Sequence, residues 1–125
     1  MNKPIRARVL LVEDDSLLRH AFKLLLEDAG YAISEAGTAA HAIETAQAVL
    51  PDLILLDMGL PDANGLDVAR ALRKGGMRDT PIIALTGRVG AEEKAACLAA
   101  GCTSYLTKPI EPKTLVKRLE EFLSD

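Results

Sequence analysis

Several polar side chains in this chain stand directly after short apolar runs. The acids Glu13, Asp14 and Asp15 follow residues 9–12, Asp57 follows 53–56, Thr86 follows 82–85, and Lys108 follows Tyr105-Leu106-Thr107. If these runs are parallel strands, their carboxyl ends meet at one edge of a sheet, where such sheets bind ligands. Carboxylates, a hydroxyl and an ammonium from distant parts of the sequence would then share one pocket.

This set of side chains suits a divalent metal ion and a phosphoryl group. Carboxylates gathered in one crevice repel one another unless a cation joins them, and hard oxygen ligands favour Mg²⁺. Thr86 and Lys108 would offer a hydroxyl donor and a positive charge to an anion on that metal. Asp57 could serve as a ligand only, or as a nucleophile whose carboxylate becomes an acyl phosphate. Its central place in the pattern favours the second role.

Each residue also has an ordinary structural interpretation. Acids suit the positive end of a helix dipole, and we expect Asp15 to cap the helix that begins near Ser16. Alone, Lys108 would be a solvated surface lysine and Thr86 a common strand residue. The pairing of Asp14 with Asp57 is harder to explain in this way, because both follow strands at the position where the strand order would reverse.

Composition narrows the class of protein. The chain has 125 residues, 49% hydrophobic and 26% charged, which is typical of one soluble globular domain over residues 1–125. A net charge of -3 and a pI near 5.4 disfavour direct nucleic-acid binding. No run approaches the roughly 20 apolar residues of a membrane span. Cys97 and Cys102 lack metal-ligand spacing and are expected to be buried thiols. We expect a cytoplasmic location.

Five strand patterns alternate with five helix patterns. We predict strands at 8–13, 31–36, 53–57, 82–86 and 103–107. Apolar residues at helical spacing within 18–29, 39–50, 66–72, 95–99 and 115–123 predict five helices, the fourth flanked by Gly90 and Gly101 and the last with Pro112 in its first turn. Strict alternation implies a doubly wound parallel sheet of α/β class. The second and fifth strands are the more polar and should lie at the edges. The order 2-1-3-4-5 of a flavodoxin-like (βα)5 fold follows.

At this point the chain resembles the receiver domains of two-component response regulators from end to end. The matching segments are Val9-Leu10-Leu11-Val12-Glu13-Asp14-Asp15, 53–62 (LILLDMGLPD), Asn64-Gly65-Leu66, 81–87 (PIIALTG) and 99–109 (AAGCTSYLTKP). Five segments in order and at family-like spacing make the resemblance specific.

The resemblance implies a role for each site residue. Asp57 would be the phosphoacceptor, Asp14 a direct ligand of Mg²⁺ or Mn²⁺, and Glu13 an acid acting through metal-bound water. The Gly59 carbonyl would complete the ligands, Thr86 would bond a phosphoryl oxygen, Lys108 would pair with the phosphoryl group, and Tyr105 would change rotamer with Thr86. The Lys108-Pro109 bond would be cis. Gly59 and Arg88 occupy positions that influence the attacking water, so the lifetime of the phosphorylated state is left open.

The resemblance also implies partners. The phosphoryl donor would be a sensor histidine kinase or a histidine phosphotransfer protein, and the domain would catalyse its own phosphorylation and dephosphorylation rather than turn over outside substrates. The phosphoryl group would switch a partner-binding surface made of the fourth helix, the fifth strand and the fifth helix. The Ala-rich fourth helix is predicted to move. The downstream partner is open, and we expect a monomer or weak dimer.

Three other interpretations compete. A haloacid-dehalogenase-like phosphatase would need a second Asp two residues after the nucleophile, where Gly59 stands. A receiver-shaped domain that no longer takes phosphate would not need Glu13, Asp14, Asp57, Thr86 and Lys108 together. A flavodoxin would need a Ser/Thr/Gly-rich phosphate loop after the first strand, and the segment after the first strand here lacks one. The chain is either a single-domain regulator or a receiver from a longer protein, and segments 97–101 and 105–110 look most like receivers attached to hybrid histidine kinases.

Overall fold

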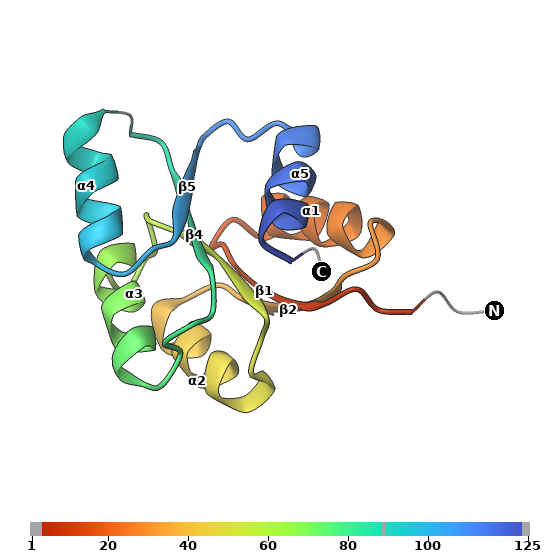
Figure 1. Cartoon of the computed structure of the whole chain (residues 1–125), viewed down its shortest axis with the longest axis horizontal. Helices are drawn as coiled ribbons and strands as arrows, with labels where there is room; N and C mark the ends of the chain where they lie inside the picture. The colour runs from red at the N-terminus through yellow and green to blue at the C-terminus, as the bar shows by residue number, and fades with distance from the viewer. Residues whose placement is uncertain (1–3, 89, 124–125) are drawn as a thin grey trace.

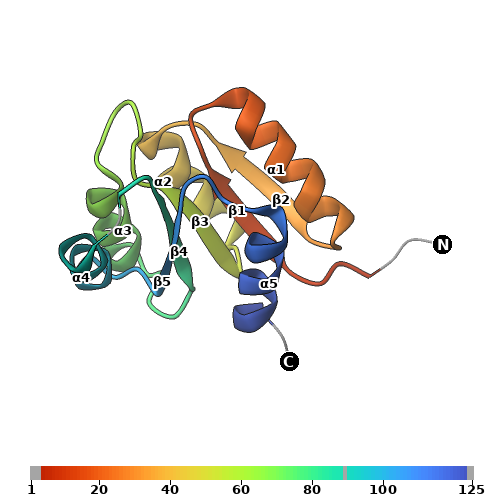
Figure 2. The same ribbon diagram turned by 90° about the horizontal axis from the view of Figure 1, so that it is seen from above.

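A computed structural model of the chain describes residues 4–88 and 90–123. It contains a five-stranded, all-parallel sheet in the order β2-β1-β3-β4-β5, which confirms the predicted topology. The strands are β1 (Arg8–Val12), β2 (Ala32–Ala36), β3 (Leu53–Asp57), β4 (Ile82–Thr86) and β5 (Ser104–Thr107). Helices cover both faces of the sheet, so the molecule has three layers (Figures 1 and 2).

The helices are α1 (Ser16–Asp28), α2 (Ala39–Val49), α3 (Gly65–Lys74), α4 (Ala91–Ala99) and α5 (Pro112–Leu123). They cover the apolar spacings that predicted them, apart from Ala29 and Leu50, which are the C-caps of α1 and α2. α4 lies between Gly90 and Gly101, although its first turn carries Glu92 and Glu93 and shows no apolar spacing. Its first residue follows Gly90, which has no side chain to signal a cap.

The core consists of two apolar clusters on opposite faces of the sheet. Along β3, Leu53 and Leu55 pack with α1 and α5, whereas Ile54 and Leu56 pack with α2, α3 and α4. Successive strand residues point to opposite faces, so a strand covered on both sides must be apolar throughout. β3 and β4 are buried at every position. This burial explains why the central strands were readable as continuous apolar runs.

The carboxyl-terminal end of α4 is closed tightly. Gly101 has a φ of 107°, and the Cys102 amide donates to the Cys97 carbonyl at 3.0 Å. This arrangement is a Schellman motif, which normally brings the side chains of those two positions into apolar contact. Cys97 and Cys102 are accordingly buried free thiols, as predicted.

The guanidinium of Arg73, near the end of α3, holds this same turn from outside. It donates to the Gly101 carbonyl through Nε at 3.0 Å and through Nη2 at 2.7 Å. Its Nη1 donates to the carbonyls of Met77 and Thr80, in the loop that leads into β4. Arg73 therefore ties α3, the α4–β5 turn and the start of β4 together, at the end of the sheet opposite the polar residues.

Within the described part of the chain, no helix is long and apolar enough to cross a lipid bilayer.

Candidate functional site

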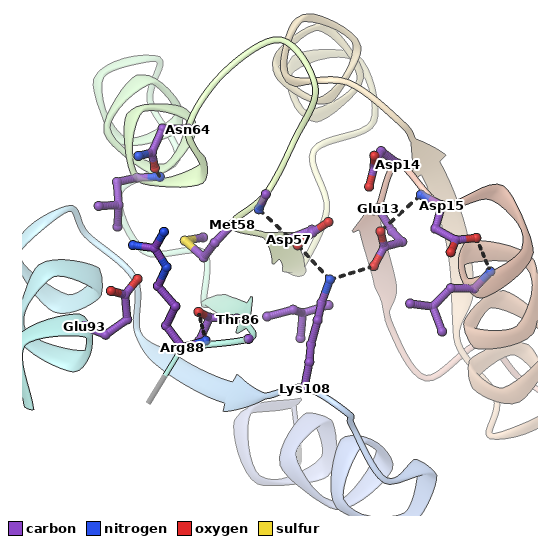
Figure 3. Close-up of a pocket in the computed structure, with 15 residues that line it drawn as sticks. Glu13, Asp14, Asp15, Asp57, Met58, Asn64, Thr86, Arg88, Glu93 and Lys108 are labelled. Atoms are coloured by element: carbon purple, nitrogen blue, oxygen red, sulfur yellow. Dashed lines mark hydrogen bonds and ion pairs between the residues drawn. The ribbon is translucent and has the colours of Figure 1, made fainter. Parts of the chain in front are cut away.

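The polar residues that follow the apolar runs converge as predicted. Asp57 and Thr86 are the last residues of β3 and β4, and Glu13 and Lys108 directly follow β1 and β5. All four, with Asp14, line an open cleft of about 800 Å³ at the carboxyl edge of the sheet. Figure 3 shows the side chains of Glu13, Asp57 and Lys108 pointing toward one another across this cleft.

The three consecutive acids all line the cleft but differ in burial and in partners. Glu13 is 1% exposed, whereas Asp14 and Asp15 are exposed. Asp15 Oδ1 accepts from the backbone amides of Leu17 and Leu18 at 3.0 and 3.1 Å, which confirms the predicted N-cap of α1. Oxygens of Glu13, Asp14 and Asp57 lie within 4.8 Å of one another. These three acids can therefore offer one ligand each to a single cation.

The ammonium of Lys108 binds the buried acids. Its Nζ lies 2.9 Å from Asp57 Oδ1 and 3.3 Å from Glu13 Oε1. Burial lowers the pKa of Lys108, but the hydrogen bonds and charges of Asp57 and Glu13 outweigh that effect and leave this pKa raised. The Lys108 backbone amide also donates to the Thr86 carbonyl at 2.7 Å, and the Lys108-Pro109 peptide bond is cis, as the resemblance implied.

Glu13 is a buried carboxyl whose pKa is raised. Burial, together with the neighbouring Asp57 carboxyl, raises the pKa of Glu13 from 4.5 to about 7. The Asp15 amide donates to Glu13 Oε2 at 3.2 Å, which opposes the rise. A buried carboxylate that resists ionisation gains most from a cation beside it. The donor set thus fits Mg²⁺: hard carboxylate oxygens, excess negative charge, and an open side where water can complete the coordination.

Thr86 is buried at 3% exposure, and its Oγ1 accepts from the Arg88 amide at 3.1 Å. The hydroxyl proton can still be donated into the cleft. Tyr105 lies elsewhere: it is half-buried and lines a second hollow beside Lys94 and Arg118 rather than the acidic cleft. The structure therefore brings Thr86 to the acids but places Tyr105 outside their pocket.

Gly59 and Arg88 leave the outer side of the cleft open. The Gly59 amide donates to Asp57 Oδ1 at 3.1 Å, and a Cβ added at Gly59 would meet no atom within 4 Å. The guanidinium of Arg88 extends along the other wall, between Glu93 and Asn64 (Figure 3). No side chain at position 59 restricts approach to Asp57 from this side.

Two residues that support the cleft were not foreseen from the sequence. Arg19, on α1, donates to the Glu13 carbonyl at 2.7 Å and to Glu35 Oε1 at 3.3 Å. Asp62, in the loop after β3, accepts from two amides of α2. Three of these four contacts join residues at least 16 positions apart, so no local pattern reveals them. For Asp62, the one available signal was that a charged residue stands in the short stretch between Pro61 and Asn64.

The fold and the cleft define a class: a flavodoxin-like α/β domain with an acidic, lysine-paired site at its strand ends. A family model for the response regulator receiver domain matches residues 9–120. The chain therefore belongs to the response regulator receiver domain family, and it is a signalling domain of two-component systems.

Relatives of known sequence and structure agree with this assignment. The PhoP virulence transcriptional regulatory protein of Shigella flexneri is 37% identical over 93% of this chain. The match covers 52% of that protein, so the chain spans about half the length of such curated relatives. The chemotaxis protein CheY4 of Vibrio cholerae superposes with a TM-score of 0.89 at 35% identity, covering 94% of this chain and 98% of CheY4.

A third relative bears on the metal. The receiver domain of the sensor histidine kinase PA1611 of Pseudomonas aeruginosa has a TM-score of 0.86 and 30% identity, covering 95% of this chain and 98% of its own. That structure is described with a magnesium ion coordinated in the active site cleft. The acidic cluster of Glu13, Asp14 and Asp57 suggests a metal site in the present chain too.

Proposed function

We propose that this domain accepts a phosphoryl group from a phosphohistidine onto Asp57, with Mg²⁺ or Mn²⁺ bound by Glu13, Asp14, Asp57 and the Gly59 carbonyl. The observation that carries the proposal is the contact of Lys108 Nζ with Asp57 Oδ1 at 2.9 Å in a cleft that Glu13 and Asp14 also line. This pairing puts a cation beside the carboxylate that ends the central strand β3. An ordinary helix cap or surface acid is not buried beside a lysine in this way.

The residues have separate tasks in the transfer. A carboxylate oxygen of Asp57 forms a bond to phosphorus as the phosphorus–nitrogen bond to the donor imidazole breaks, and the imidazole leaves with the electrons of that bond. Negative charge spreads over the equatorial phosphoryl oxygens in the transition state. Lys108 and the Thr86 hydroxyl stand where they can meet that charge. When bound, Mg²⁺ neutralises the acids and the incoming phosphoryl oxygens.

The phosphorylated form would differ from the free form mainly around Thr86 and α4. Thr86 Oγ1 accepts from the Arg88 amide, so a Thr86 that turns to the phosphoryl group releases the start of the β4–α4 loop. α4 begins at Gly90 without a side-chain cap and buries only Cys97 along its length, whereas its other end is held by Arg73. We therefore propose that the amino-terminal half of α4 moves, with Tyr105 and the surface of α4, β5 and α5 serving as the switch that a partner reads.

We also propose a class of phosphoryl donor and a cellular location for this domain. The donor is a sensor histidine kinase or a histidine phosphotransfer protein, and residues 1–125 act as one receiver domain in the cytoplasm, where the free thiols of Cys97 and Cys102 are stable. Turnover of outside phosphate esters is disfavoured, because position 59 carries no second carboxylate. The relatives include a transcriptional regulatory protein and the receiver domain of a sensor histidine kinase, so a receiver attached to a regulator and one attached to a kinase both agree with them.

Acetyl phosphate with Mg²⁺, followed by intact-mass measurement, tests the chemistry. We expect the wild type to gain one phosphoryl group that chelation of Mg²⁺ prevents and that alkaline hydroxylamine removes. Asp57→Asn should gain none. Asp79→Asn is the matched control, because Asp79 is an exposed acid in the loop before β4, at the opposite end of the sheet. A wild type that stays unlabelled, or an Asp57→Asn protein labelled like the wild type, would refute the proposal.

A further inference from the structure

The loop between β3 and α3 is hydrogen-bonded to the first turn of α2 through the carboxylate of Asp62, and its Leu60 and Ala63 pack against the apolar cluster that includes α2. Asp62 Oδ1 accepts from the Ala39 amide at 2.7 Å, and Oδ2 accepts from the Ala40 amide at 3.1 Å. Asp62 is exposed, so burial does not hold it there. The two amides hold the pKa of Asp62 below its usual value. An ionised carboxylate at the start of a helix also gains from the positive end of the dipole.

Helix α2 does not need Asp62 to cap its first residue. Thr38 is the N-cap of α2, and its Oγ1 accepts from the His41 amide at 3.1 Å. Asp62 satisfies two other amides of the first turn, which have no partner within the helix. Two acceptors at one helix end therefore come from different places: Thr38 from the chain entering α2, and Asp62 from a loop more than 20 residues further on.

Helix α2 is a firm anchor for that loop. Its residues Ala39, Ala42 and Ala46 are buried against the sheet. Small side chains let the helix lie close to the strands, where a shift would open a void. A loop bonded to the first turn of α2 therefore has its position set relative to the sheet, and so relative to Asp57.

The loop itself carries Gly59. The base of the loop is tight: the Gly65 amide donates to the Met58 carbonyl at 3.1 Å, and Gly59 pairs with Asn64 as an isolated bridge. Gly59 has no side chain to pack, and a Cβ there would meet open space. The direction of its carbonyl depends on backbone contacts and on where the loop tip is held. Among the hydrogen bonds of the described residues, those to Asp62 join the tip to α2.

We propose that Asp62 is a positioning residue for the metal site: by clipping the loop tip to α2, it aims the Gly59 carbonyl at the cation held by Glu13, Asp14 and Asp57. The inference rests on the proposed function, because it assumes that a cation binds there. Groups that orient a metal ligand without touching the metal commonly change metal affinity when they are removed. The effect is reciprocal, so a bound cation should in turn protect the contact between the loop and α2.

Mg²⁺ titration followed by amide chemical shifts tests this role in the whole domain. Asp62→Ala removes both acceptors, and we expect the Mg²⁺ dissociation constant to rise about tenfold. Asp62→Asn keeps one acceptor and should show a smaller rise. Thr38→Ala is the matched control, because it weakens the same end of α2 without touching the loop, and its dissociation constant should stay within about twofold of the wild type.

Amide exchange gives a second readout that a purely structural role would not move. Saturating Mg²⁺ should slow exchange at Ala39 and Ala40 in the wild type but not in Asp62→Ala, which lacks both acceptors. The inference is overturned if Asp62→Ala binds Mg²⁺ like the wild type, or if Thr38→Ala weakens binding equally. If the wild type binds Mg²⁺ and Asp62→Ala binds it equally well, only the role of Asp62 is overturned and the proposed function stands. A wild type that binds no Mg²⁺ overturns the proposed function as well.

Discussion

Replacing Glu13 by Gln should stabilise the metal-free protein, and the gain should grow with pH. The pKa of Glu13 is raised from 4.5 to about 7 by its burial and by Asp57. Between these values the folded protein keeps a proton that the unfolded chain has released. Folding is therefore favoured by acid, and stability is lost as the pH rises through about 7. Gln has the shape of the protonated acid and does not titrate in this range.

The magnitude follows from the size of the shift. A change from 4.5 to about 7 corresponds to about 3 kcal/mol. The amide of Gln offers one acceptor where Glu13 has two, binding Asp15 N and Lys108 Nζ, and this mismatch costs about 1 kcal/mol. We therefore expect Glu13→Gln to be about 2 kcal/mol more stable than the wild type at about pH 8 in a chelator. At about pH 4 it should be no more stable than the wild type.

Urea unfolding followed by far-ultraviolet circular dichroism measures this difference, since the chain contains no Trp. Unfolding in Mg²⁺ should reverse the ranking at high pH, because the cation stabilises ionised Glu13 and binds the folded state. Glu121→Gln is the control, because Glu121 is exposed on α5. Its stability should change by no more than about 0.5 kcal/mol at either pH. A Glu13→Gln protein no more stable than the wild type at high pH in chelator would refute the electrostatic reasoning.

Three further changes test other parts of the structure. Lys108→Met should slow labelling by acetyl phosphate about 10²-fold, because the transition-state charge loses its cation. The same change should tighten Mg²⁺ binding, because the ammonium no longer neutralises Asp57, and weaker Mg²⁺ binding would contradict this account. Arg73→Lys should cost about 2–4 kcal/mol in urea unfolding, because an ammonium cannot match the fork that reaches Gly101, Met77 and Thr80. Full stability in that variant would show that the contacts are incidental. Gly101→Ala should cost more than Gly76→Ala: both have φ above 100°, but only at Gly101 would the new Cβ lie 2.9 Å from Arg73 Cγ. If thermal unfolding gives equal losses of about 1 kcal/mol, the backbone conformation alone accounts for both, and the contact with Arg73 adds nothing.

Much of the fold was predictable because its signals are local. β3 and β4 were readable as apolar runs since each is covered on both faces, and the predicted ranges match the strands. The Asp15 cap was predictable for the same reason, because a cap bonds amides two and three residues ahead. The start of α4 has weaker local signals: Gly90 offers no side-chain cap, and the acidic first turn shows no apolar spacing.

The sequence by itself determined which residues would meet. Parallel strands separated by helices bring their carboxyl ends to one edge, so Glu13, Asp57, Thr86 and Lys108 had to converge once the order 2-1-3-4-5 was established. Strand alternation and crossover handedness fix this arrangement before any side-chain contact is known. The pattern of residues was enough to locate the site.

Only the tertiary structure decided what each acid experiences. Glu13 and Asp14 are neighbours of the same chemical class, yet one is buried beside Lys108 and the other is exposed. The contacts of Asp62 with α2 and of Arg73 with Gly101 join residues more than 20 positions apart and could not be read from the local sequence. Burial and long-range hydrogen bonds depend on how elements pack, and packing also determines the local dielectric that raises the pKa of Glu13. Topology thus determined that the site residues converge, whereas packing determined the charge state of Glu13 and the hydrogen bonds that hold the surrounding loops.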